Sequence, residues 1–149
     1  MREKINAALV VAMKAQEKRR MCTLRLINAA IKDRDIAARG AGKDALGDED
    51  VLEILSKMVK QRKESARAYE DGGRLELAEQ ELEEIQIIRE FMPQQLDNDA
   101  MNSVCAEVVE SLGAAGLRDM GRTMAALKER YPGQMDFGQA SKLVREMLQ

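Results

Sequence analysis

Apolar residues recur at intervals of three and four positions along most of the chain, and this spacing restricts the fold more than any other feature. Such spacing gathers the residues on one side of a helix, as Leu24, Ile27 and Ile31 illustrate. Only 3% of residues are aromatic and tryptophan is absent, so the core must be built mainly from aliphatic residues and ten methionines. Strand-forming residues are too sparse for a sheet. We therefore expect an all-α fold.

The first two predicted helices are separated by a bend. A short first helix has Ile5 and Ala12 on its apolar side and ends at a bend over residues 16–18. The second helix is longer and ends near Arg39, where Gly40 provides a C-terminal stop. The apolar residues expected along the second helix are Cys22, Leu24, Leu26, Ile27, Ala29, Ala30 and Ile31.

Two further helices are expected before residue 93. A flexible connection over residues 40–47 precedes Asp48, whose carboxylate is expected to accept hydrogen bonds from the free amides of a third helix. Gly72 and Gly73 end that helix. The fourth helix follows at once, and so short a turn makes the third and fourth helices antiparallel neighbours.

Pro93 predicts the boundary between two domains. Proline has no amide hydrogen and disfavours helical geometry at the preceding residue, so the fourth helix should end at Met92. We place the boundary between Pro93 and Asp97. The sequence thus predicts an N-terminal helical domain over residues 1–93, built around helical hairpins, and a C-terminal tail domain over residues 97–149.

The tail domain is expected to be a bundle of three short helices. Asp97 or Asn98 caps the first of them, and Gly113 closes it. Pro132 stops the second helix, and Asp136 caps the third. With one apolar stripe on each helix, the three form a minimal bundle.

The residues that usually carry catalysis are scarce. Histidine, the commonest general base and metal ligand, is absent. Cys22 and Cys105 are far apart in apolar stretches, so we expect buried reduced thiols and no zinc site. We therefore expect no catalytic residues, no metal, no cofactor and no enzymatic activity of the chain alone.

Charge is unevenly distributed along the chain. Residues 1–47 carry eleven Lys/Arg against five Asp/Glu, a net charge of +6, whereas residues 48–93 carry seven against thirteen, a net charge of −6. Residues 94–149 carry six against eight, a net charge of −2. The molecule is therefore polarised and not basic overall.

Two groups of cations on the second and third helices are candidate phosphate contacts. In the first group the cations are seven residues apart, which is almost two helical turns, so each cation is rotated only about 20° around the helix from the previous one. This basic row consists of Lys18, Arg25, Lys32 and Arg39. The basic cluster of the third helix consists of Lys57, Lys60, Arg62, Lys63 and Arg67, of which Lys60, Lys63 and Arg67 share a face.

A structural explanation competes with the binding site. The fourth helix carries an acidic row at the same spacing, Glu76, Glu83 and Glu90, which could pair with the cations. Within the third helix, Glu53 could pair with Lys57 and Lys60 with Glu64, each pair contributing about 0.3–0.5 kcal/mol at most. Taken alone, the residues favour a solvated charged face. The scarcity of aromatics also argues against the stacking of unpaired bases.

Several stretches, taken in order, resemble the GatB/YqeY family over essentially the whole length. The sequence is similar to stand-alone YqeY-like proteins, with small departures at Phe91-Met92 and over residues 133–137. The matching stretches are Ala12-Met13-Lys14-Ala15, Thr23-Leu24-Arg25-Leu26-Ile27, Ala29-Ala30-Ile31-Lys32, residues 57–65, Tyr69, residues 73–81, Pro93-Gln94-Gln95-Leu96 and Asp119-Met120-Gly121-Arg122-Thr123-Met124.

The resemblance implies a helical N-terminal region, a three-helix tail and a link to tRNA. It implies kinship with the tail of the B subunit of tRNA-dependent amidotransferases, which are carbon-nitrogen ligases with glutamine as amido-N-donor. In those enzymes the related tail engages tRNA, while other domains and subunits perform the chemistry. Similar domains are also appended to some glutaminyl-tRNA synthetases.

Two hypotheses follow from these observations. In the first, the protein contacts tRNA backbone non-specifically through the second and third helices, assisted by Arg118, Arg122 and Lys128 in the tail. In the second, the helical body docks on an amidotransferase, a synthetase or another protein without nucleic acid. No apolar run is long enough for a membrane span, and the N-terminus lacks the apolar run of a signal peptide, so we expect a bacterial-type cytoplasmic protein without a membrane partner.

Overall fold

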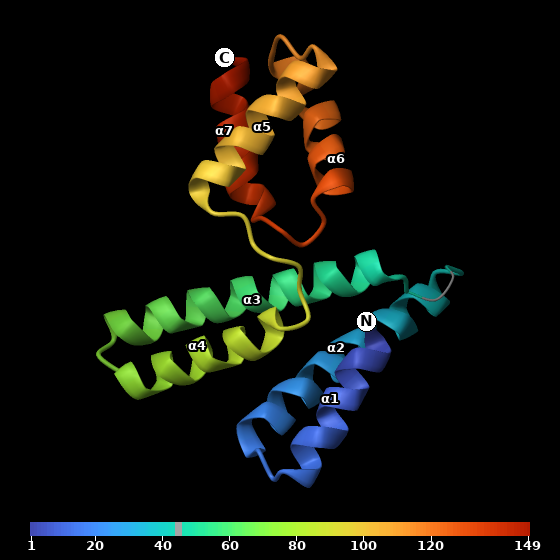
Figure 1. The fold of residues 1–149 in the computed structure, drawn as a ribbon, viewed down its shortest axis with the longest axis vertical. Helices are drawn as coiled ribbons and strands as arrows, with labels where there is room; N and C mark the ends of the chain where they lie inside the picture. Colours follow the sequence, from blue (N-terminus) through green and yellow to red (C-terminus); the bar gives the residue numbers. More distant parts are fainter. Residues whose placement is uncertain (44–45) are drawn as a thin grey trace. The chain divides into compact units, whose positions relative to one another are not determined.

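The computed structural model describes residues 1–43 and 46–149 (Figure 1). Over these residues the chain forms seven α-helices and one short 3-10 helix and has no strand, which confirms the predicted all-α fold. It divides into two compact units, Met1–Pro93 and Gln94–Gln149. Asp44 and Ala45, which belong to the predicted flexible connection, lie outside the described residues.

The N-terminal unit consists of two helical hairpins (Figure 1). In the first hairpin α1 (Arg2–Lys14) packs on α2 (Lys18–Gly40), and in the second α3 (Asp48–Asp71) packs antiparallel to α4 (Leu75–Arg89). The predicted bend after the first helix and the antiparallel pairing of the third and fourth helices are both confirmed.

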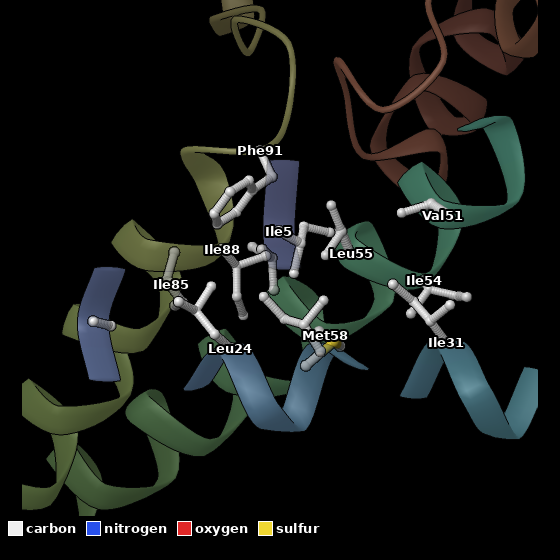
Figure 2. Close-up of a cluster of buried hydrophobic side chains, with 13 residues drawn as sticks. Ile5, Leu24, Ile31, Val51, Ile54, Leu55, Met58, Ile85, Ile88 and Phe91 are labelled. Carbon is white, nitrogen blue, oxygen red and sulfur yellow. The ribbon is translucent and has the colours of Figure 1, made fainter. Parts of the chain in front are cut away.

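A single apolar core joins the four helices of this unit (Figure 2). Each helix contributes at least one fully buried residue, including Ile5 from α1, Leu24 from α2, Leu55 from α3 and Ile88 from α4. Complete burial of a side chain of this size contributes about 1.5–3 kcal/mol relative to leaving it exposed. Because the core is shared, the two hairpins stabilise each other.

Two predicted helix ends differ from the observed ones. The N-cap of α3 is Gly47, whose amide donates to the Asp50 carboxylate at 3.1 Å, so Asp48 is not the cap. Helix α4 ends at Arg89, before the predicted end at Met92. The amides of Phe91 and Met92 donate to carbonyls three residues back, which tightens the chain and buries Phe91 in the core.

The C-terminal unit is a bundle of three helices, as predicted. Its elements are α5 (Asn98–Leu112), the 3-10 helix η1 (Leu117–Asp119), α6 (Met120–Arg130) and α7 (Phe137–Leu148). The Asp97 carboxylate accepts a hydrogen bond from the Ala100 amide, and the Asp136 carboxylate accepts one from the Gly138 amide. Both predicted caps are therefore confirmed. The main buried residues of this unit are Met101, Cys105, Val108, Leu127, Met135, Ala140, Val144 and Leu148.

Several helices end in Schellman motifs, in which one residue after the helix has a left-handed backbone. Gly73 and Gly113 occupy this position after α3 and α5, with φ of 75° and 62°. After α1 the position is held by Gln16, with φ of 57°, and the Glu17 amide donates to the Ala12 carbonyl at 3.0 Å. A side chain in this conformation costs roughly 1–2 kcal/mol.

Replacing Gln16 with glycine should therefore stabilise the protein. We expect Gln16→Gly to raise the free energy of unfolding by about 1 kcal/mol, because glycine adopts positive φ without a steric penalty. Gly73→Ala is the matched control and should lower it by a similar amount, since an added Cβ there meets no neighbouring atom and only the backbone is strained. Urea titrations of both variants test this, and a destabilised Gln16→Gly would contradict it.

One ion pair joins α1 to α2 beside the core. The Arg2 guanidinium contacts the Asp35 carboxylate at 2.5 Å, and the Asp35 side chain is 18% exposed. The hydrogen bond from Arg2 holds the pKa of Asp35 below its ordinary value of 3.8, against an opposing effect of desolvation. The pair therefore favours the folded state only while Asp35 is ionised.

This ion pair should make the packing of α1 sensitive to acid. Because the folded-state pKa of Asp35 is lowered, its contribution to stability is present above pH 3.8 and is lost as the pH falls through the folded-state pKa. We expect the difference in unfolding free energy between wild type and Asp35→Asn to shrink between about pH 6 and about pH 3. Urea titrations across this range test it, and a difference that does not change with pH would refute it.

Candidate nucleic-acid interface

The basic row lies on the outward side of α2. Leu24, Ile27 and Ile31 are buried in the core, and successive residues of a helix point about 100° apart. Positions 18, 25, 32 and 39 therefore point between about 150° and about 90° away from the core direction, turning from the outer side of α2 toward its flank along the helix. All four cations are exposed. The geometry leaves them accessible to a large ligand.

Two members of the acidic row, Glu83 and Glu90, pair with other cations. Arg19 donates to the Glu83 carboxylate, and Arg20 contacts the Glu90 carboxylate at 2.5 Å. Arg19 and Arg20 follow Lys18 directly, so they point toward α4 while the basic row points elsewhere. Within the described part of the chain, no residue of the basic row is in a salt bridge. The proposed pairing of the two rows is therefore not what the structure shows.

Arg62 differs from the rest of the basic cluster. Lys57, Lys60, Lys63 and Arg67 are exposed, whereas the Arg62 side chain is only 13% exposed. Its Nε donates to the Glu84 carboxylate of α4 at 3.0 Å, and one terminal nitrogen donates to the Met58 carbonyl at 3.4 Å. Arg62 thus joins α3 to α4 inside the unit.

The surroundings of Arg62 are acidic. Burial, followed by the neighbouring charge of Glu84, raises the pKa of Glu81, while Arg62 opposes the rise. One guanidinium therefore offsets the charges of two carboxylates at the seam between α3 and α4. Nothing in the sequence distinguishes Arg62 from the four other cations around it, so this role could not be predicted.

Neither of the two ion pairs considered within α3 forms among the described residues, and Glu53 pairs with another helix instead. Glu53 contacts Arg34 of α2 at 3.4 Å, and not Lys57. Neither Lys57 nor Lys60 is in a salt bridge among the described residues. Lys57 lies beside a groove of about 470 Å³ between α2 and α3.

The three tail cations have different surroundings. Arg118 is exposed, Arg122 contacts Asp119 at 3.3 Å, and the Lys128 ammonium lies 6.0 Å from the centre of the Phe137 ring. A hydrogen bond from the Ala115 amide is the main cause that lowers the pKa of Asp119. The Asp119 carboxylate therefore offsets part of the positive charge of Arg122 at the start of α6.

Three of the apolar residues expected along the second helix are exposed. Cys22, Leu26 and Ala29 lie on the outer side of the helix, since Thr23, Leu24 and Ile27 take the inward positions. The prediction of a buried thiol is thus wrong for Cys22 and confirmed for Cys105, whose pKa is raised by burial. Ile36 is exposed as well. The sequence signal that could have revealed this exposed surface is a second set of apolar residues at helical spacing, Cys22, Leu26, Ala29 and Ile36, on a different side of the helix from the core residues.

The described residues form neither a metal site nor a membrane-spanning helix. Among the described residues, no group of three or more His, Cys, Asp and Glu side chains is arranged to hold a metal ion. No helix in this part of the chain combines the length and apolar character needed to cross a membrane. The exposed cations remain the most distinctive feature.

Comparison with known protein families extends these observations. The sequence profile of the family described as "Yqey-like protein" matches residues 2–148, essentially the whole chain. The chain belongs to the YqeY-like family. The resemblance inferred from its motifs is thereby confirmed.

Relatives of this YqeY-like protein occur in fungi. An uncharacterized protein of Schizosaccharomyces pombe is 33% identical over 94 residues, which are 63% of this chain and 73% of the relative. The mitochondrial protein named "Altered inheritance of mitochondria protein 41" is 34% identical over 83 residues in Lachancea thermotolerans, covering 56% of this chain and 43% of the relative. Its counterpart in Eremothecium gossypii is 31% identical over 116 residues, covering 78% and 58%.

Removing Arg62 should destabilise this YqeY-like protein. We expect Arg62→Met to lower the free energy of unfolding by roughly 1–3 kcal/mol, because it leaves the half-buried Glu84 without its cation. Arg25→Met, which removes an exposed and unpaired cation, is the matched control and should change it by less than about 0.5 kcal/mol. Urea denaturation measures both. Equal effects of the two substitutions would show that Arg62 has no special structural role.

Proposed function

We propose that this YqeY-like protein is a non-catalytic accessory module that contacts the backbone of tRNA. The observation that carries the proposal is the exposure of the basic row while Glu83 and Glu90 are paired with Arg19 and Arg20. The sequence resemblance to the tail of tRNA-dependent amidotransferases supports tRNA as the nucleic acid. The proposal also links the protein to glutamine-dependent transamidation, with the chemistry performed by partner enzymes.

The arrangement of the cations suits phosphates better than bases. Seven residues of helix span about 10.5 Å, so the basic row presents regularly spaced charges along α2. Lys60, Lys63 and Arg67 add exposed charges on one face of α3. Only 3% of residues are aromatic, which disfavours recognition by stacking. We therefore propose non-specific backbone contact, with Arg118, Arg122 and Lys128 as secondary contacts.

Binding of tRNA should weaken steeply with salt. Each neutralised phosphate releases counterions, so a footprint of four phosphates should weaken binding about 100-fold between about 50 and 200 mM salt. Titration of fluorescently labelled tRNA with the full-length protein at several salt concentrations measures this slope. Absence of binding at low salt would refute the proposal.

Charge-reversal variants locate the contact surface. Lys18→Glu, Arg25→Glu and Lys32→Glu combined should abolish binding, and the same change at Lys60, Lys63 and Arg67 should weaken it. The matched control reverses three exposed cations outside the candidate surface, Lys4, Lys14 and Lys142, with the same change in net charge. Equal loss of affinity in the control would mean that only net charge matters.

A further inference from the structure

The outer side of α2 carries exposed aliphatic residues in a regular pattern. Leu26 is 49% exposed and Ile36 is 67% exposed, and Cys22 and Ala29 lie on the same side of the helix. Cys22, Leu26, Ala29 and Ile36 are here called the outer stripe. Their spacings of four, three and seven residues match the a and d positions of a heptad repeat, with Asp33 at the remaining position.

The basic row borders the outer stripe along its length. Arg25 directly precedes Leu26, and Lys32 directly precedes Asp33, so the cations take the g positions of the same heptads. In paired helices, charges at the e and g positions select the partner. Four cations on one border require carboxylates on the partner.

We propose that the outer stripe and the basic row together dock an acidic amphipathic helix of another protein. The partner helix carries an apolar stripe bordered by Asp or Glu at seven-residue spacing. Asp33, at an a position, favours a cationic residue at the facing position and so fixes the register. The inference goes beyond the proposed contact with tRNA, because phosphates make no use of exposed aliphatic side chains.

The charges of α2 argue against a second copy of the chain as the occupant. In a pair of α2 helices the e positions would be Thr23, Ala30 and Ala37, none of which is a carboxylate. In a parallel pair each basic row would face these neutral e positions, and in an antiparallel pair the two basic rows would face each other, so neither arrangement supplies counter-charges. The carboxylates of Glu83 on α4 and of Glu90, directly after α4, are already bound by Arg19 and Arg20.

A designed peptide tests the docking surface. The probe has about 21 residues, with Leu at the a and d positions, one central Lys at an a position, and Glu at e and g. Its control carries Lys in place of each Glu. We expect the Glu peptide, labelled for fluorescence anisotropy, to bind the full-length protein and the Lys peptide not to bind. No binding of the Glu peptide, or equal binding of the two, would overturn the proposal.

Substitutions on α2 and α4 locate the binding. Leu26→Ser with Ile36→Ser should weaken binding of the Glu peptide at least about tenfold, since both aliphatic contacts are lost. The matched control is Leu75→Ser with Leu82→Ser, which changes two exposed leucines of α4 and should leave affinity unchanged. Circular dichroism and urea midpoints verify that both double variants remain folded. An equal effect of the two would overturn the proposal.

Native thiols give an independent readout. Cys22 lies within the outer stripe and is exposed, whereas Cys105 is buried. Bound Glu peptide should slow the reaction of Cys22 with a thiol reagent, and an unchanged rate at saturating peptide would place the peptide elsewhere and refute the site.

Other occupants give distinct results. Self-association removed by Leu26→Ser with Ile36→Ser would identify a second copy as the occupant, and binding to anionic vesicles with the same sensitivity would identify a lipid surface. Either result would overturn the proposal of a protein helix. Charge reversal at Lys60, Lys63 and Arg67 should weaken tRNA binding without affecting the peptide, so failure of one proposal can be told from failure of the other.

Discussion

The burial of Leu24 and Ile27 in the shared core fixes the rotation of α2 about its own axis, and the surface of the N-terminal unit depends on that rotation. With these residues inward, Arg19 and Arg20 point toward α4, and the basic row lies exposed along the outer side and flank of α2. A rotation of α2 by one residue would exchange these positions. The apolar core therefore decides which charges are free.

The pairing of charges follows from the same packing. Because the basic row and the acidic row share a seven-residue spacing, the sequence suggested that the cations of the basic row pair with the carboxylates of the acidic row. Instead, Arg19 and Arg20 bind the carboxylates of α4, and Arg62 binds Glu84. These pairs engage Arg19, Arg20 and Arg62 and leave the cations of the basic row exposed and without a salt bridge among the described residues. A protein of net charge −2 can thus still present a basic surface.

Two ligands are proposed for neighbouring surfaces of the N-terminal unit. The basic row serves both, because phosphates and carboxylates are both anions, whereas only a helix uses the outer stripe. Binding of tRNA and of an acidic helix at α2 would then be mutually exclusive, while Lys60, Lys63 and Arg67 would remain available to RNA.

The sequence by itself determined the helices and many of their ends, because these depend on local chemistry. Apolar spacing predicted the all-α fold, and Asp97, Gly113 and Asp136 marked helix ends through hydrogen bonds and backbone geometry within a few residues. Only the tertiary structure decided that Cys22 is exposed, that α4 ends before Phe91 and that Arg62 is an internal ion pair. These features depend on which side of each helix meets a neighbour, and spacing along one helix does not contain that information.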